Sequence, residues 1–410
     1  MASGIFVAAR SLALSVAAAI ALNLWAASVV AQPVDAANTV TATRIVGDQS
    51  RTRFIADLTD EVTVNVFSLA DPYRIIIDLP EVHFQLASGT GNAGFGLISA
   101  YRFGLISRGQ SRIVLDASEP VEVANYYVLA PVGEEPARLV VDLVPTTREV
   151  FLADALQYRE AEGQIAVASP PLSDNFGDGR QVVVIDPGHG GIDPGAVGTR
   201  GVLEKDIVLA FSLELADQLR ATGRYEVLMT RETDTYPSLT DRVEFARASR
   251  ADILLSIHAD SFPQQTSVRG AAVFTVSERA STQMVADLAA RENRADILAG
   301  LNIPGATDEV FDILIDFARR ETKNFSIVLA REIIDGLEAV TELAPNPQQE
   351  AGFVVLKAPD VPSVLVELGF LTNSEDEEVL QSSEWRRQTA ATLVAAIGAF
   401  FETRIAGIAR

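Results

Sequence analysis

The residues best suited to chemistry in this sequence are two histidines and two glutamates. His189 and His258 each follow a run of apolar residues, Glu204 precedes an amphipathic segment, and Glu367 ends the run SVLVE. Two histidines and one carboxylate form a known catalytic zinc set that leaves a fourth position for water. We therefore expect His189, Glu204 and His258 to bind Zn²⁺ and Glu367 to act as the catalytic base.

Predicted strands and one helix position these side chains. The apolar residues before Asp186 indicate a buried strand, and the glycines and prolines from Pro187 to Gly195 exclude helix or strand around His189. Apolar residues then recur every four positions, which places Glu204 at or just before the first turn of a helix. In open α/β sheets, ligand sites form beyond the carboxyl ends of the strands. We therefore expect all four residues to meet at one edge of a sheet.

The chain is long enough for two domains and more. Of its 410 residues, 48% are hydrophobic and 21% are charged, which is typical of globular proteins with a sizeable core. Residues 181–410 alternate predicted strands and helices. This pattern predicts an α/β fold: a mainly parallel twisted sheet flanked by helices, in a catalytic domain that follows a small β-sandwich domain.

Charge and composition exclude several classes of partner and site. The net charge of -22 argues against nucleic acid and against an anionic membrane surface, since both would repel the chain. The absence of cysteine excludes disulfides and thiolate metal sites. Of the three histidines, His83 lies alone in the β-rich part, and we interpret it as structural.

The first 31 residues have the pattern of a secretory signal. A basic residue, Arg10, precedes a long apolar run, and small residues stand at the end of that run. An uncleaved membrane anchor is the alternative, because the run approaches the length that spans a bilayer. In either case we expect an exported protein, located in the periplasm, with no membrane attachment once the signal is cleaved.

Residues 38–147 consist of short β-rich runs that repeat. The stretch from Arg53 to Asp57 matches that from Arg112 to Asp116, and RIIIDLP matches RLVVDLVP. Such self-similarity predicts two related halves of one β-sandwich. Because this part offers no cluster of catalytic residues, we interpret it as a binding module. Residues 148–180 are rich in proline, glycine and polar residues toward their end and are predicted to be a linker with a short helix.

The ordered set of motifs resembles the zinc-dependent N-acetylmuramoyl-L-alanine amidases of the amidase-3 family. The resemblance covers nearly all of 181–400 and rests on the motifs IDPGHGGIDPGAVG, EKDIVL, TRETDTYPSLTDR, ILLSIHADS and VPSVLVELGFLTN. It implies zinc ligands at His189, Glu204 and His258 and a catalytic glutamate at Glu367. The implied reaction is hydrolysis of the amide between the lactyl group of N-acetylmuramic acid and L-alanine of the peptidoglycan stem peptide.

Two arginines also match the family pattern. For Arg231 and Arg242, a contact with substrate and a structural salt bridge to Asp234 or Asp241 are equally good interpretations. The paired β motifs of residues 38–147 resemble the AMIN domain of certain periplasmic amidases. That resemblance implies a module that binds peptidoglycan or directs the enzyme to the division site.

An additional segment at about 279–325 interrupts the α/β pattern with two helical stretches. It is either surface decoration or, by resemblance to division-associated amidases, a helical insert that lies over the zinc cleft and blocks it until a protein activator moves it. Glu292 is the first candidate for the blocking carboxylate, followed by Asp296 and Glu309. If the insert blocks the site, deleting 279–325 should raise basal activity.

Two rival functions remain compatible with these residues. One is an inactive wall-binding protein that has kept the fold, although such proteins usually lose a ligand or the base and this chain has all four residues. The other is a zinc peptidase acting on peptidoglycan stem peptides, for which the metal chemistry would be identical. The main expectation is an amidase that works in cell-wall remodelling and daughter-cell separation.

Overall fold

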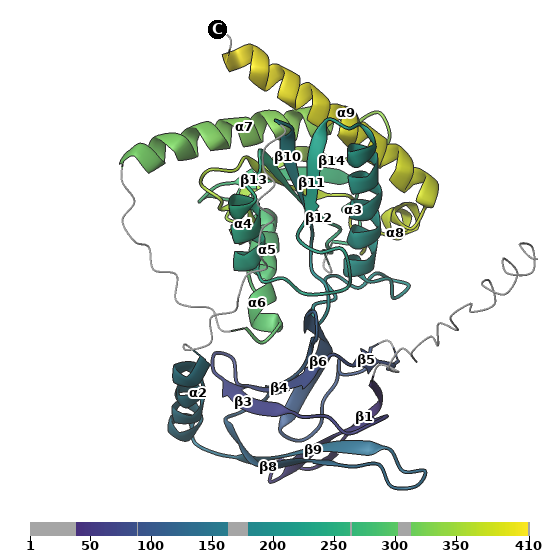
Figure 1. The fold of residues 1–410 in the computed structure, drawn as a ribbon, viewed down its shortest axis with the longest axis vertical. Coiled ribbons are helices and arrows are strands. Elements are labelled where there is room, and N and C mark those ends of the chain that lie inside the picture. The colour runs from purple at the N-terminus through teal and green to yellow at the C-terminus, as the bar shows by residue number, and fades with distance from the viewer. Residues whose placement is uncertain (1–37, 88, 163–178, 263–264, 302–312, 409–410) are drawn as a thin grey trace, which may run out of the picture. The chain divides into compact units, whose positions relative to one another are not determined.

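A computed structural model describes residues 38–87, 89–162, 179–262, 265–301 and 313–408 (Figure 1). The expected signal at 1–31 and Glu309 therefore lie outside the described residues. From Asn38 onward, the described residues belong to one compact unit that contains an all-β part and an α/β part. Their order along the chain confirms the expected fold class.

The all-β part consists of two sheets packed face to face. Apolar residues from both sheets, such as Phe54, Ile75 and Ile113, alternate with outward residues and form one shared core. The larger sheet has the order β5 (His83–Phe84), β1 (Thr39–Gly47), β2 (Thr52–Leu58), β9 (Ala137–Pro145) and β8 (Val121–Leu129). The smaller has the order β3 (Asn65–Leu69), β4 (Arg74–Pro80), β7 (Gln110–Ala117) and β6 (Ile98–Ser107).

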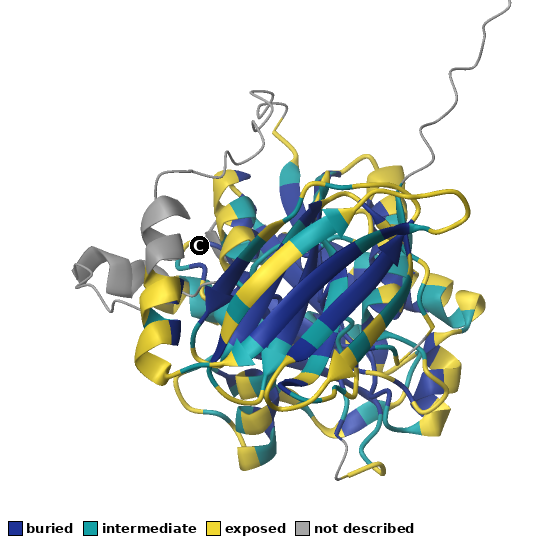
Figure 2. Cartoon of the chain, turned by 90° about the horizontal axis from the view of Figure 1, so that it is seen from below, coloured by how far each residue is buried: buried dark blue, intermediate teal, exposed yellow. Residues whose placement is uncertain are grey.

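The internal repeat of the sequence is visible in the strand pairing. Arg53 of β2 lies opposite Asp142 of β9, and Arg112 of β7 lies opposite Asp78 of β4. Each sheet therefore carries the same arginine and aspartate pair at its centre. Figure 2 shows the contrast between strands of mostly buried residues and the exposed residues at sheet edges, such as those of β8. His83 is exposed, and its backbone pairs β5 with β1.

Part of the segment expected as a linker is helical. Helix α2 (Arg148–Glu162) follows the last strand of the β-sandwich, and its Phe151 is buried in the core of that domain. The ring of Phe151 packs edge-on against Tyr73, with ring centroids 5.0 Å apart. The helix is thus an extension of the β-domain.

A six-stranded sheet forms the centre of the α/β part. Its order is β11 (Tyr225–Met229), β10 (Gln181–Pro187), β12 (Ile253–His258), β15 (Ser363–Glu367), β13 (Ala271–Val276) and β14 (Leu343–Ala351). The first four strands are parallel, whereas β13 runs antiparallel to β15 and parallel to β14. The sheet is therefore mainly parallel, as expected, and its strands β10, β12 and β15 end at one edge.

Helices cover both faces of this sheet (Figure 1). One face packs against three long helices, α3 (Glu204–Ala221), α7 (Ile313–Leu337) and α9 (Ser383–Ile408). The other face packs against α4 (Leu239–Ala248), α5 (Gln283–Glu292) and the short 3₁₀ helix η1 (Val354–Leu356). Two short helices complete this part, α6 (Ala295–Leu298) and α8 (Ser374–Leu380).

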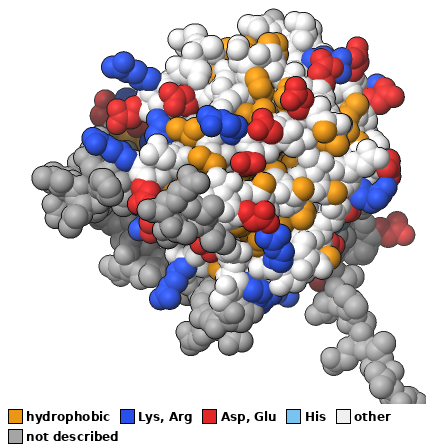
Figure 3. Space-filling view, turned by 90° about the horizontal axis from the view of Figure 1, so that it is seen from above, with side chains coloured by type: hydrophobic (Ala, Val, Ile, Leu, Met, Phe, Trp, Pro, Cys, Tyr) orange, Lys and Arg blue, Asp and Glu red, His pale blue; other side chains and the backbone are white. Residues whose placement is uncertain are grey.

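The surface shows how the acidic charge is distributed. On the face shown in Figure 3, acidic and basic side chains are interspersed with hydrophobic ones. Among the described residues, no helix has both the length and the apolar composition that crossing a bilayer requires.

Candidate metal centre

Two histidines and a glutamate converge at the edge where the strands end. His189 lies in the loop after β10, His258 is the last residue of β12, and Glu204 is the first residue of α3. Their ligand atoms all lie within 4.8 Å of one another. Glu204 reaches both rings, with Oε2 3.2 Å from Nε2 of His189 and Oε1 3.2 Å from Nδ1 of His258. The structure thus brings together the three residues that the sequence marks as metal ligands.

The donor atoms fit a metal ion. Nε2 of His189 and Nδ1 of His258 are buried and have no hydrogen-bond partner. Buried polar atoms nearly always have a partner, so two such nitrogens aimed at one point need an explanation. A cation bound by both nitrogens and by the carboxylate of Glu204 supplies it, because two imidazoles and one carboxylate are a common catalytic donor set.

Asp193 fixes the ring of His189. Its Oδ2 lies 2.8 Å from Nδ1 of His189, and its Oδ1 accepts a hydrogen bond from the amide of Gly195 at 3.1 Å. This contact directs the free Nε2 toward the metal position. Sequence reasoning missed Asp193, although its position four residues after His189 in the glycine loop was visible.

The glycine loop holds His189 in an unusual backbone conformation. His189 has a φ of 56°, in the left-handed region that most residues avoid. A β-carbon on Gly188 would lie 2.4 Å from the ring of His258, so only glycine allows the two histidines to approach each other here. The glycine motif thus allows the two histidines to approach each other and also lets the chain reverse direction.

Glu204 is held rigidly as a carboxylate. Besides facing both histidines, it accepts hydrogen bonds from the amides of Ala196 and Ala259, each at 2.8 Å. Burial by itself would raise the pKa of Glu204, but His189 and His258 hold that pKa well below its usual value. The group is therefore charged and ready to bind a cation.

Glu367 lies beside this donor set. It is fully buried at the end of β15, directly opposite His258 in the neighbouring strand. Its Oε2 accepts a hydrogen bond from the amide of Asp260 at 3.0 Å, whereas Oε1 is buried without a partner. Burial, together with Asp260 and Glu204, raises the pKa of Glu367 well above its usual value. One free oxygen with a high proton affinity is what a general base in a cleft needs.

Arg242 and Arg231 hold the backbone of the histidine loop. Arg242 forms a buried ion pair with Asp186 at 2.6 Å and donates to the carbonyl of His189 at 2.8 Å. Arg231 donates to the carbonyls of Pro187 and Gly188, at 3.0 and 2.8 Å. In these contacts both side chains support the loop.

The acidic partners suggested by the sequence for these arginines were wrong. Asp234 pairs with Lys205 at 2.7 Å, and Asp241 caps helix α4 together with Ser238. The true acidic partner of Arg242, Asp186, comes from the strand that precedes the loop.

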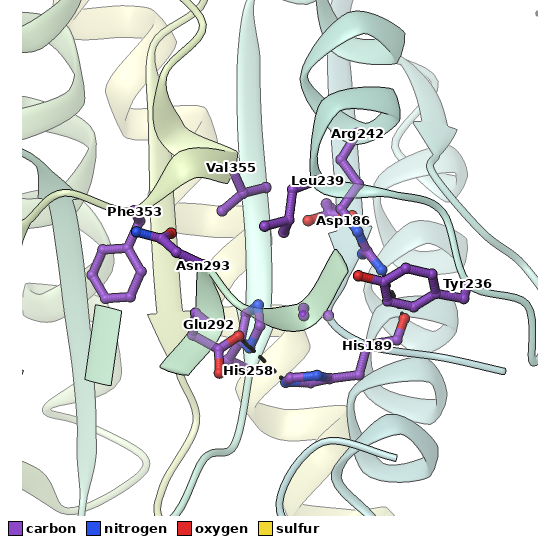
Figure 4. A pocket seen from close by; sticks show the side chains of 12 residues that line it. Asp186, His189, Tyr236, Leu239, Arg242, His258, Glu292, Asn293, Phe353 and Val355 are labelled. Atoms are coloured by element: carbon purple, nitrogen blue, oxygen red, sulfur yellow. Dashed lines mark hydrogen bonds and ion pairs between the residues drawn. The ribbon is translucent and has the colours of Figure 1, made fainter. Parts of the chain in front are cut away.

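Glu292 of the additional segment points into the metal position. It ends helix α5, and its Oε2 lies 3.5 Å from Nε2 of His189 and 3.3 Å from Nδ1 of His258 (Figure 4). Burial raises the pKa of Glu292 to about 7 despite the two histidines. The second candidate, Asp296, instead accepts hydrogen bonds from the hydroxyl of Tyr236 and the amide of Leu239, each at 2.9 Å.

Comparison with known proteins identifies related chains. Residues 183–399 match the Amidase_3 family, described as N-acetylmuramoyl-L-alanine amidase, and residues 42–143 match the AMIN domain. The N-acetylmuramoyl-L-alanine amidase AmiC of Escherichia coli O6:H1 is 31% identical over 392 residues, which is 92% of this chain and 93% of that protein. AmiC of Neisseria meningitidis serogroup B is 33% identical over 394 residues, covering 92% and 94% of the two chains. The solved structure of amidase AmiC2 of Nostoc punctiforme covers 55% of this chain and 99% of its own, with 27% identity and a TM-score of 0.40.

Proposed function

The chain belongs to the N-acetylmuramoyl-L-alanine amidase family and carries an AMIN domain, and we propose that its hydrolysis of peptidoglycan depends on Zn²⁺ held by His189, Glu204 and His258. The single observation that carries this proposal is the pair of unpartnered, buried ring nitrogens that face one carboxylate. The bond cleaved is the amide between the lactyl group of N-acetylmuramic acid and L-alanine of the stem peptide.

Different residues of the chain perform different steps of amide hydrolysis. His189, Glu204 and His258 would hold Zn²⁺, which would polarise the carbonyl under attack and lower the pKa of a water molecule to about 7. Glu367 takes the proton of the attacking water through its free Oε1 and passes it to the departing amide nitrogen. The C–N bond breaks, the lactyl group leaves as a carboxylate and the stem peptide leaves with a free amino group. Asp193 holds the ring of His189 in place throughout.

Within our proposal, Glu292 blocks this site in the resting state of the protein. Its carboxylate lies within 3.5 Å of both metal-binding nitrogens, where it occupies space that a substrate carbonyl or water would need. An acidic side chain in the open ligand position leaves a folded enzyme with only a low basal rate. Full activity then requires that the end of α5 move, and binding of a protein activator supplies the free energy for that movement.

The cellular setting follows from the domains. The AMIN domain and the AmiC relatives indicate a periplasmic or secreted protein that works on peptidoglycan. Within our proposal, residues 1–31 are a signal peptide, the mature protein acts in the periplasm, and its task is cell-wall remodelling during daughter-cell separation.

A digest of purified cell-wall sacculi tests the reaction and the residue roles. Mass spectrometry of the soluble products should detect intact stem peptides that begin with L-alanine, whereas a stem-peptide peptidase would release shortened peptides. Glu367→Gln should keep its bound zinc and lose about 10²–10⁴-fold in rate, as expected for loss of a general base. His189→Ala should lose both zinc and turnover, and a chelator should stop the wild type. Full turnover by Glu367→Gln, or by metal-free protein, would refute the proposal.

A further inference from the structure

The loop that follows Glu292 lies on the outer face of the smaller β-sheet. This loop, residues 295–300, contains α6 and the two residues after it, and we call it the docked segment. Three arginines of the sheet, which we call the arginine face, donate to its carbonyl oxygens: Arg74 to Ile297, Arg102 to Leu298 and Arg112 to Gly300. The carbonyl of Ile297 also accepts from the amide of Gly300 at 3.0 Å, so Arg74 binds its second lone pair, whereas Leu298 and Gly300 lie at and beyond the end of α6.

Apolar contacts reinforce this docking. Ala295 and Ala299 of the docked segment share one buried cluster with side chains of the sheet that include Ile76 and Val114. Gly300 has a φ of 69°, and a β-carbon there would lie 2.7 Å from Cδ1 of Ile76 and 2.8 Å from Cγ2 of Val114. The segment therefore approaches the sheet as closely as glycine permits.

Neighbouring carboxylates and carbonyls hold the three arginines in position for this contact. Arg102 is paired with Asp116 and Arg112 with Asp78, each through two hydrogen bonds. Arg74 is 3% exposed, and its guanidinium donates to the carbonyls of Ala70 and Pro72 besides that of Ile297. A buried cation is costly unless its donors are satisfied, so the docked segment contributes to keeping Arg74 in place.

The other sheet of the same domain provides an internal comparison. The repeat gives it the same three arginines in equivalent positions: Arg138 for Arg74, Arg44 for Arg102 and Arg53 for Arg112. The side chain of Arg53 is 40% exposed, whereas that of Arg112, beneath the docked segment, is 5% exposed. Both arginines keep an aspartate partner at 2.6 Å, so the difference comes from what covers them: Arg112 lies over the ring of Phe67 and beneath the docked segment.

A short, firmly bonded stretch connects the docked segment to Glu292. Asn293 donates to the carbonyl of Gly352 at 2.9 Å and accepts from the amide of Val354 at 2.8 Å. Asp296 accepts hydrogen bonds from the hydroxyl of Tyr236 and the amide of Leu239, both in the α/β part. With so few residues between them, the position of the docked segment limits how far the end of α5 can move.

We propose that the arginine face is an intramolecular docking surface that holds residues 295–300 and thereby keeps Glu292 at the metal position. The β-domain is then part of the control of the active site as well as a wall-binding module. This inference rests on the proposed blocking role of Glu292. By linkage, whatever displaces the docked segment from the arginine face favours the open site, and opening of the site frees the arginine face.

The test compares matched variants of the full-length, zinc-loaded protein. Release of dye from labelled sacculi is measured with no other protein added. Arg112→Gln loosens the docking from the sheet side, and Arg53→Gln is its control, since it removes the arginine partner of an aspartate in the equivalent position. Gly300→Val loosens it from the segment side. Its control is Gly223→Val, where φ is 67° and nothing lies within 4 Å of a β-carbon.

We expect Arg112→Gln and Gly300→Val to raise the basal rate roughly 5-fold or more, as is usual for coupled sites, toward the rate of Glu292→Ala. Both controls should stay within about 2-fold of the wild type, less than the smallest usual coupling effect. Hydrogen exchange should also show loss of protection at the amides of Leu298, Ala299 and Leu301 in the two test variants only.

The possible outcomes distinguish the docking role of the arginine face from the blocking role of Glu292. If Glu292→Ala is faster than the wild type while Arg112→Gln and Gly300→Val are not, the docking role is refuted and the blocking role stands. If Glu292→Ala is no faster, the blocking role itself is refuted, and with it the regulatory inference. A rate increase in Arg53→Gln equal to that in Arg112→Gln would show general destabilisation and would also refute the docking role.

Discussion

At the scale of single residues, the candidate metal centre depends on side chains outside the proposed ligand set. Asp193 is the clearest case, because its contact with Nδ1 of His189 at 2.8 Å leaves Nε2 facing Glu204 and His258. We predict that Asp193→Ala lowers zinc affinity by roughly 10–100-fold, the usual effect of removing such a partner. Competition with a fluorescent chelator measures this affinity. Asp217→Ala, at an exposed position on α3, should bind zinc as the wild type does.

The buried pair of Asp186 and Arg242 makes stability depend on pH. Burial by itself would raise the pKa of Asp186, but Arg242 and the hydroxyls of Thr230 and Ser256 lower it below its usual value. The stability gained from this lowered pKa is therefore complete above about pH 4 and is lost as the pH falls further. Asp186→Asn should cost about 3–5 kcal/mol at neutral pH, because it leaves a buried cation unpaired.

Urea unfolding at pH 7, 5 and 3 checks this prediction. The difference between wild type and Asp186→Asn should be constant from pH 7 to 5 and shrink at pH 3. Asp360→Asn, which breaks an exposed pair with Arg247, should cost less than about 1 kcal/mol throughout. A difference that grows toward acid pH would contradict this reading of the pair.

The sequence alone predicted which residues meet at the edge of the sheet better than it predicted the residues that support them. His258 and Glu367 could be found because strands of a parallel sheet end at one edge, and the structure places them opposite each other. Asp193 was overlooked because an aspartate among glycines is also the usual residue of a turn. The partner of Arg242 was misassigned because sequence proximity favoured Asp241 over Asp186, which only the fold brings near.

At the scale of elements, helix α5 is part of the core as well as the carrier of Glu292. Val285 and Leu288 are fully buried against the sheet, in a cluster that includes Phe274 and Phe353. The additional segment predicted at 279–325 also reaches into α7, whose Phe325 packs edge-on against Phe400. Deleting the whole segment would therefore expose core residues in addition to opening the site.

Point substitutions in α5 distinguish its contribution to core packing from the blocking role of Glu292. We predict that Leu288→Ala lowers the free energy of unfolding by about 2–5 kcal/mol, the usual cost of emptying a buried leucine site. Because the weakened helix holds Glu292 less firmly, the basal rate on sacculi should also rise. Glu292→Ala should raise the rate with little loss of stability. Asp287→Ala, on the exposed side of α5, should change neither quantity.

The sequence could not predict exact element boundaries or strand directions. Helix α8 is capped by Asn373, whose side chain accepts from the amides of Glu375 and Asp376, although the neighbouring Ser374 is also a usual capping residue. Local patterns of serine and asparagine are nearly equivalent as caps, so the choice depends on the approach of the preceding loop. The antiparallel direction of β13 was equally hidden, since hydrophobic periodicity carries no direction.

At the scale of the whole molecule, contacts between distant segments join the β-domain to the metal loop. The amide of Ile192 donates to the carbonyl of Leu105 in β6 at 3.2 Å, and a β-carbon on Gly104 would lie 2.5 Å from the backbone of Gly191. Sequence patterns could predict both domains but could not predict this contact, because it pairs segments nearly ninety residues apart with no shared motif. The loop that carries His189 is therefore braced by the β-domain on one side and by Arg231 on the other.

Metal binding should consequently stabilise the whole folded chain. A ligand that binds only the native state at 100 times its Kd adds about 2.7 kcal/mol, which corresponds to a rise in Tm of about 5–10 °C for a domain of this size. We predict such a rise when zinc is added to chelator-treated protein, followed through the fluorescence of Trp385. Glu367→Gln should show the full rise because its three metal ligands are intact. His189→Ala should show almost none, and a rise in that variant equal to the wild type would mean that the stabilising ion binds elsewhere.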